Sequence, residues 1–128
     1  MRILLDTCAF LWIISGDRKL SDRAAELFMD ADNDVHLSAV STWEISIKHA
    51  LRRLSLPDAP ERFIPEQRRM HGIESLSLDE ESTMCLKRLP KIHDDPFDRM
   101  LICQAIVNGM AILTPDEFIS RYPVRTIW

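Results

Sequence analysis

The chain opens with MRILLDTCAFLWIISG (Met1–Gly16), and this stretch decides the fold. Residues 2–5 form an apolar run of strand length that ends at Asp6. A second apolar run extends from Thr7 to Ser15 and stops at Gly16, a residue type that commonly closes helices. A buried strand joined directly to a helix predicts the first unit of a parallel α/β sheet.

The rest of the chain repeats this alternation of strands and helices. Further strands are expected at residues 35–38, 73–76, 111–113 and 124–127. Further helices are expected from Asp22 onward, at Ser41–Leu54, from about Arg62 to Met70, at 79–88 and at Pro96–Asn108. We therefore predict an α/β fold in which helices flank a mainly parallel sheet, with residues 1–128 forming a single domain.

Composition narrows the protein class. The longest apolar stretch, Cys8–Ile14, is too short to span a bilayer. Residues 2–14 place a positive charge before an apolar run, but Asp6 interrupts it and no cleavage site follows, which argues against a signal peptide. The three cysteines show no paired spacing, which favours a reducing, cytoplasmic setting without disulfides or structural zinc.

The net charge is −4, which argues against a general polyanion-binding surface. The distribution is uneven, because residues 48–91 hold nine of the sixteen Lys and Arg side chains. A basic rim beside an acidic pocket is compatible with this pattern.

Four acidic residues occupy positions where a strand ends or a helix begins: Asp6, Glu44, Asp98 and Asp116. The carboxyl ends of parallel strands face one crevice, where α/β proteins bind their ligands. Four carboxylates at such positions predict one acidic pocket. Oxygen ligands of this kind suit a hard divalent cation such as Mg²⁺ or Mn²⁺.

Each of these acids also has a purely structural interpretation as a helix cap. Asp6 precedes a helix, Ser41 and Glu44 have capping-box spacing, and Asp98 stands in a first turn after Pro96. Near Asp116, Thr114 is the expected cap. Capping does not require the four acids to converge, whereas metal binding does, and convergent carboxylates repel one another without a cation or protonation.

The order and spacing of several short blocks are similar to those of the PIN-domain ribonucleases, and among them of the VapC-type toxins of toxin–antitoxin systems. The resemblance covers nearly the whole chain. It rests on Leu4–Thr7, Ser38–Ile45 with Lys48, Leu54–Pro57, His93–Arg99 continuing to Ala105, Leu113–Asp116 and the terminal Trp128.

The resemblance implies a three-layer α/β/α sandwich and an endoribonuclease that depends on Mg²⁺ or Mn²⁺. In such an enzyme a metal-activated water attacks an RNA phosphodiester. The catalytic and metal-binding positions fall on Asp6, Glu44, Asp98 and Asp116, with Asp6 and Asp98 expected as direct ligands. Thr7, Lys48, Arg99 and Thr114 are candidates for contacts with the substrate.

The same resemblance implies partners. A cognate antitoxin protein and a second copy of the chain are expected, with DNA contacted only through the antitoxin and no membrane. Residues 8–14 are apolar on every side of a helix, and one sheet covers one side only. We therefore expect this helix to lie in a protein interface.

Two functions from other classes remain open. A phosphoacceptor receiver-like domain also places acids at strand ends, but no adjacent acidic pair follows the first strand. A non-catalytic interaction module would use the acids only as caps, and a Mn²⁺ titration separates it from an enzyme. Among the remaining candidates, Trp43 is expected in the core rather than stacked on an RNA base. His93 shows no paired spacing for zinc.

Overall fold

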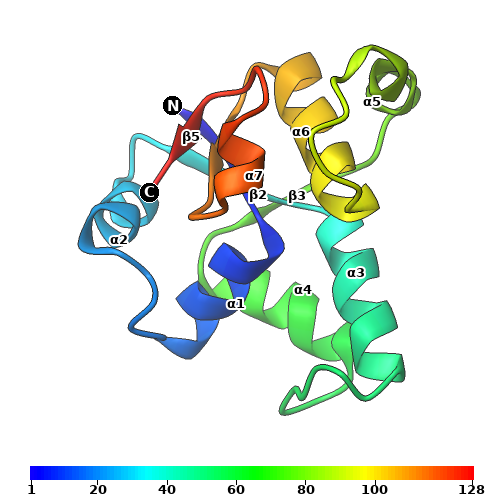
Figure 1. The fold of residues 1–128 in the computed structure, drawn as a ribbon. Helices are drawn as coiled ribbons and strands as arrows, with labels where there is room; N and C mark the ends of the chain where they lie inside the picture. The colour runs from blue at the N-terminus through cyan, green and yellow to red at the C-terminus, as the bar shows by residue number, and fades with distance from the viewer.

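The computed structural model describes all 128 residues, and a five-stranded sheet forms its centre (Figure 1). The strand order is β3-β2-β1-β4-β5, and every neighbouring pair is parallel, which confirms the predicted sheet. The strands are β1 (Arg2–Leu5), β2 (Asp34–Ser38), β3 (Glu74–Leu76), β4 (Ala111–Leu113) and β5 (Thr126–Ile127).

The helices connect these strands and cover both faces of the sheet. They are α1 (Thr7–Ser15), α2 (Asp22–Met29), α3 (Ala39–Ala50), α4 (Pro60–Met70), α5 (Glu80–Cys85), the 3₁₀ turn η1 (Leu86–Arg88), α6 (Pro96–Asn108) and α7 (Glu117–Ser120). The predicted bounds of α1 and α6 are confirmed. Both helices end at a glycine in the left-handed region, Gly16 and Gly109, where a side chain would be strained.

Two hydrophobic clusters, one on each face of the sheet, give the predicted three layers. The alternation of β1 sends Ile3 and Leu5 to one face, where they belong to a cluster with residues of α1, α2 and α4. Leu4 points to the other face and joins residues of α5, α6 and α7. The central strand is therefore buried on both faces, as expected for a parallel sheet.

Several local expectations were wrong, among them the end of α3, which is at Ala50 rather than Leu54, and the start of β5, which is at Thr126 rather than Val124. Helix α3 begins at Ala39, because the Ser38 hydroxyl accepts a hydrogen bond from the Val40 amide and caps the helix three residues earlier than predicted. Helix α4 begins at Pro60, which occupies the first helical position, where proline loses no hydrogen bond. Trp43 is 56% exposed rather than in the core, and its ring packs edge-on against Phe97.

The strand order reverses at one place along the edge of the sheet where the strands end. The order reverses between β1 and β4, so the chain leaves these two neighbouring strands in opposite directions. Asp6 follows β1 and Thr114 follows β4, and both lie at this switch point, where ligands bind in open α/β sheets. None of the helices has the length and apolar character needed to cross a membrane.

Candidate active site

Asp6 lies at the centre of the site, at the end of β1. Its carboxylate caps α1 by accepting a 2.6 Å hydrogen bond from the Ala9 amide. The Thr114 hydroxyl donates to the other carboxylate oxygen of Asp6 at 2.5 Å. These two contacts, from α1 and from the end of β4, fix the orientation of a side chain that is only 5% exposed.

Glu44 reaches the site from the second turn of α3, and two partners hold it. The Thr7 hydroxyl donates to Glu44 Oε1 at 2.7 Å, and Lys48 Nζ lies 2.5 Å from Glu44 Oε2 one helical turn away. The hydrogen bond with Glu44 raises the pKa of Lys48. This buried carboxylate is therefore paired with a half-exposed cation that neutralises it.

Asp98 comes from the first turn of α6. Asp95 caps this helix, and its carboxylate accepts a hydrogen bond from the Asp98 amide. The Asp98 carboxylate is left to other partners: its Oδ2 lies 3.1 Å from His93 Nε2, and its Oδ1 accepts no hydrogen bond within the chain. One oxygen of Asp98 is thus available to a ligand.

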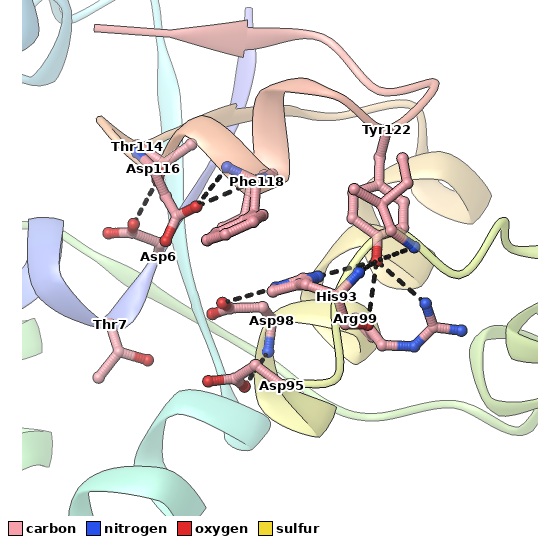
Figure 2. A network of polar contacts seen from close by, with 12 residues as sticks. Asp6, Thr7, His93, Asp95, Asp98, Arg99, Thr114, Asp116, Phe118 and Tyr122 are labelled. Carbon is pink, nitrogen blue, oxygen red and sulfur yellow. Dashed lines mark hydrogen bonds and ion pairs between the residues drawn. The ribbon is translucent and has the colours of Figure 1, made fainter.

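Asp116 caps α7 itself, which corrects the predicted cap at Thr114. Its Oδ1 accepts hydrogen bonds from the amides of Phe118 and Ile119. The Thr114 hydroxyl accepts from the Asp116 amide and donates to Asp6, so it links the two acids. Figure 2 shows Asp6, Asp98 and Asp116 on neighbouring elements around one space.

The pKa values of Asp6 and Asp98 are raised, in part by the neighbouring carboxylates. Burial raises the pKa of Asp6 to about 6, and the charges of Asp98 and Asp116 add to the effect against the hydrogen bonds from Thr114 and Ala9. Burial also raises the pKa of Asp98 to about 6, against the lowering effect of the His93 hydrogen bond and with smaller contributions from the charges of Asp95, Asp116 and Glu44. The charges of Asp98 and Asp116 therefore reach Asp6, and the charges of Asp116 and Glu44 reach Asp98.

The capping interpretation explains two of the four acids. Asp6 and Asp116 do cap helices. Glu44 does not, because Ser38 caps α3. Asp98 is not a cap either, but it stands in the first turn of α6 behind Asp95 and Pro96, where its structural interpretation placed it on the helix dipole. The proposed capping box of Ser41 and Glu44 is therefore wrong, and neither Glu44 nor Asp98 serves as a helix cap.

The donor set fits a hard divalent cation. It consists of carboxylate oxygens, two of which belong to buried groups whose raised pKa values show that negative charge is destabilised there. No three His, Cys, Asp or Glu side chains stand close enough to form a ready-made ligand cage. Mg²⁺ is commonly held by one or two carboxylates and several waters, so a cage is not required.

The other predicted candidates have structural partners. The Thr7 and Thr114 hydroxyls orient Glu44 and Asp6, and Lys48 pairs with Glu44. The Arg99 guanidinium turns away from the acids: its Nη1 donates to the Pro90 carbonyl and to the Tyr122 hydroxyl, each at 3.0 Å. Contact between these four residues and a substrate remains a prediction.

Sequence reasoning missed two residues beside the acids. His93 and Tyr122 lie in one polar network with Asp98 and Arg99 (Figure 2). His93 stands five residues before Asp98 in the segment that precedes α6, and no sequence pattern joins the two residues. Tyr122 is the only tyrosine of the chain, but no sequence pattern connects it to His93, 29 residues away.

Comparison with known proteins identifies a family profile that spans most of the chain. The PIN domain profile matches residues 3–124. Ribonuclease VapC16 of Mycobacterium tuberculosis is 35% identical over 57 residues, which span 44% of this chain and 40% of that protein.

Solved structures with the same fold cover almost the whole chain at low identity. DNA-bound VapBC from Salmonella typhimurium superposes with a TM-score of 0.69 at 20% identity, over 99% of this chain and 97% of the other. FitAcB from Neisseria gonorrhoeae gives 0.66 at 18% identity, over 98% and 96% of the chains. VapBC2 from Rickettsia felis, bound to a promoter DNA fragment, gives 0.65 at 14% identity, over 99% and 98%.

Proposed function

The chain belongs to the PIN-domain family, and on this premise we propose that it is an endoribonuclease dependent on Mg²⁺ or Mn²⁺ and the toxin of a toxin–antitoxin pair. The observation that carries the proposal is Asp6 at the switch point of the sheet, with Asp98 and Asp116 near enough to raise its pKa and Glu44 near enough to raise that of Asp98. The sequence likeness to a ribonuclease agrees with it.

In this proposal Asp6 and Asp98 hold the cation directly. Asp98 offers the free Oδ1, and Asp6 keeps lone pairs beyond the two hydrogen bonds it accepts. Glu44 and Asp116 orient waters around the ion or contribute to a second ion. When bound, the ion stabilises negative charge on a scissile phosphate and lowers the pKa of an attacking water.

The chain supplies orientation in addition to charge. Thr114 fixes Asp6, and Thr7 and Lys48 fix Glu44, so the carboxylates are in place before RNA arrives. Such preorganisation lowers the reorganisation needed in the transition state. With the acids neutralised by the cation, an RNA phosphate can approach a pocket that otherwise repels it.

An apolar groove supports the proposed antitoxin. Leu11 and Ile14 of α1 line a cavity of about 490 Å³ together with Leu54, Leu56 and Phe63. In α1 the side chains of Thr7, Ala9, Phe10 and Ile13 are buried, whereas those of Leu11, Trp12 and Ile14 are only partly covered. The neighbours in the structural comparison are complexes of the VapBC and FitAB type, and we propose that an antitoxin segment and a second copy cover the remaining apolar surface.

A direct test of the function combines RNA cleavage with a matched pair of variants. The purified protein is incubated with total RNA at several Mn²⁺ concentrations, and the cleaved ends are sequenced. Asp98→Asn is expected to remove cleavage, whereas Asp94→Asn is expected to retain it, because the Asp94 side chain is 88% exposed and outside the site. Cleavage without added divalent ion, or equal cleavage by both variants, would contradict the proposal.

A phosphoacceptor domain is less compatible with the site. Asp6, the acid at the end of the central strand, is committed to the Ala9 amide and the Thr114 hydroxyl and is buried. The nearest lysine among the predicted site residues, Lys48, is paired with Glu44 rather than with Asp6. The nuclease is therefore the function that the geometry favours.

A further inference from the structure

A chain of hydrogen bonds leads from the buried Tyr122 through His93 to the carboxylate of Asp98. The Tyr122 hydroxyl lies 2.8 Å from His93 Nδ1, and His93 Nε2 lies 3.1 Å from Asp98 Oδ2 (Figure 2). Tyr122 is 3% exposed, and the His93 side chain is 12% exposed. The network therefore lies behind Asp98.

The hydrogen bonds around the Tyr122 hydroxyl favour one tautomer of the His93 imidazole. Its hydroxyl oxygen faces three N–H donors, from the backbone of Ile92 and His93 and from Arg99 Nη1, at 3.3, 3.1 and 3.0 Å. Three donors already compete for its two lone pairs, so a fourth donor at His93 Nδ1 is disfavoured and the hydroxyl hydrogen is left to donate. The nearest acceptor is His93 Nδ1, because the His93 carbonyl is 3.5 Å away.

The consequence concerns the other ring nitrogen. A neutral imidazole that accepts at Nδ1 carries its hydrogen on Nε2, which then donates to Asp98 Oδ2. A protonated imidazole also carries a hydrogen on Nε2. In both protonation states the same donor points at Asp98, so this contact does not depend on the titration of His93.

Aromatic packing holds the ring in place. The Phe118 ring stacks on His93 with centroids 5.3 Å apart and planes 6° apart, and Tyr122 packs on it edge-on at 5.4 Å. The Phe118 amide in turn donates to Asp116. Helix α7 thus fixes His93 and is itself capped by an acid of the site.

We propose that His93, oriented by Tyr122 and Phe118, is a positioning residue that clamps Asp98 through Oδ2 and presents Oδ1 to the divalent cation. The inference rests on the proposed function, because it assumes that Asp98 is a ligand. Partners that orient ligating groups typically change metal affinity 10- to 100-fold when removed. A contact that only ties residues 90–98 to α7 would instead change stability and leave the affinity for metal unaltered.

The test measures Mn²⁺ binding by calorimetry to the folded chain and three variants. His93→Leu removes the donor and is expected to weaken binding by about 10- to 100-fold. His93→Gln places an amide N–H near the position of Nε2 and is expected to recover most of the affinity. His49→Gln is the matched control, because the ring of His49 makes no hydrogen bond in the structure.

The outcomes separate this inference from the function beneath it. If the unaltered chain binds no Mn²⁺, the proposed function fails and the positioning role fails with it. If the unaltered chain, His93→Leu and His93→Gln bind equally, only the positioning role is overturned. If His93→Leu does not fold, Tyr122→Phe takes its place, and an affinity of Tyr122→Phe for Mn²⁺ equal to that of the unaltered chain overturns the role.

A second measurement reads the orientation of His93 without metal. Nitrogen NMR at alkaline pH distinguishes the two neutral tautomers, and the Nε2–H form is expected in the unaltered chain. Tyr122→Phe, which keeps the ring and removes the hydroxyl, is expected to shift the tautomer population and weaken Mn²⁺ binding less than His93→Leu does. A predominant Nδ1–H form in the unaltered chain would overturn the clamp.

Discussion

The two sides of the acidic site hold negative charge in different ways. On the α3 side, Glu44 is buried with a lysine at 2.5 Å and a hydroxyl donor at 2.7 Å. On the other side, Asp6 and Asp98 are buried among carboxylates with no lysine or arginine paired to them, and the pKa of each rises to about 6. One acid is neutralised from within the chain, whereas two require a proton or an external cation.

This difference indicates where a cation contributes most. An ion beside Glu44 competes with Lys48, but an ion between Asp6 and Asp98 relieves a repulsion that the fold leaves unbalanced. Lys48 also makes the net charge of the pocket less negative than four carboxylates alone would make it.

The largest expected effect is on RNA cleavage. Asp6→Asn and Asp98→Asn are expected to abolish it, because each keeps the shape of the side chain and removes a charged ligand. Lys48→Met is expected to lower kcat/KM by about tenfold or less, since an ion pair that is half exposed contributes little. Cleavage of an end-labelled RNA, with circular dichroism to verify folding, measures all three.

A larger loss of cleavage in Lys48→Met than in the two aspartate variants would contradict the proposed difference between the two sides. Normal cleavage by both aspartate variants would remove Asp6 and Asp98 from the site. If both variants fail to fold, the loss of cleavage would be explained by a structural role, such as the capping of α1 by Asp6, and would not support a ligand role.

The pH dependence of stability is the next largest effect. The pKa of Asp6 and Asp98 is raised from 3.8 to about 6 in the folded protein, so folding favours their protonated forms. The stability that they contribute is present below about pH 4 and is lost as the pH rises through about 6, by about 3 kcal/mol per group. Urea unfolding of the metal-free protein between pH 4 and pH 7 measures it, alongside the opposing titration of other carboxyls.

The variants isolate the contribution of the two acids. In Asp98→Asn the decline between these pH values is expected to be shallower, and in Asp94→Asn it is expected to match the unaltered chain. Mn²⁺ at 100 times its dissociation constant is expected to restore about 2.7 kcal/mol above pH 6 and little at pH 4, where protons occupy the carboxyls. A shift of equal size at both pH values would contradict the shared pocket.

The sign of a stability change separates the two sides at a smaller scale. At pH 7 without metal, Asp98→Asn is expected to raise the free energy of unfolding by about 1–3 kcal/mol, because it removes a repelled charge. Glu44→Gln is expected to lower it by about 1 kcal/mol, because it leaves Lys48 without its partner. Denaturant melts at one pH measure both, and changes of the same sign would show that the two sides do not differ.

How far the sequence predicts this molecule depends on how many signals agree at each position. Helices α1 and α6 were placed correctly because a capping acid stands before each and a glycine follows. The start of α3 was misplaced because Ser38 and Ser41 both suit a cap, and only the end of β2 decides between them. Trp43 was misplaced because apolar neighbours on a helix do not reveal which side the sheet covers.

The four acids of the site were found from their positions at strand ends and helix starts, since parallel strands bring such positions together. Their unequal charge environments were not predictable. The pairing of Lys48 with Glu44 has the spacing of a helix turn, but the isolation of Asp6 and Asp98 from cations depends on packing. The hydrogen bond from Arg99 to Tyr122 and the contact of His93 with Asp98 depend on how the residues after β4 fold against α6.

The central claim is that a divalent cation binds between Asp6 and Asp98. Anomalous diffraction at the manganese edge, from crystals of the protein soaked in Mn²⁺, tests it most directly. The predicted result is a peak within coordination distance of Asp98 Oδ1 and of an Asp6 carboxylate oxygen, absent from Asp98→Asn crystals treated in the same way. A fully soaked crystal with no peak at this position, or with a peak that persists in the variant, would contradict the account.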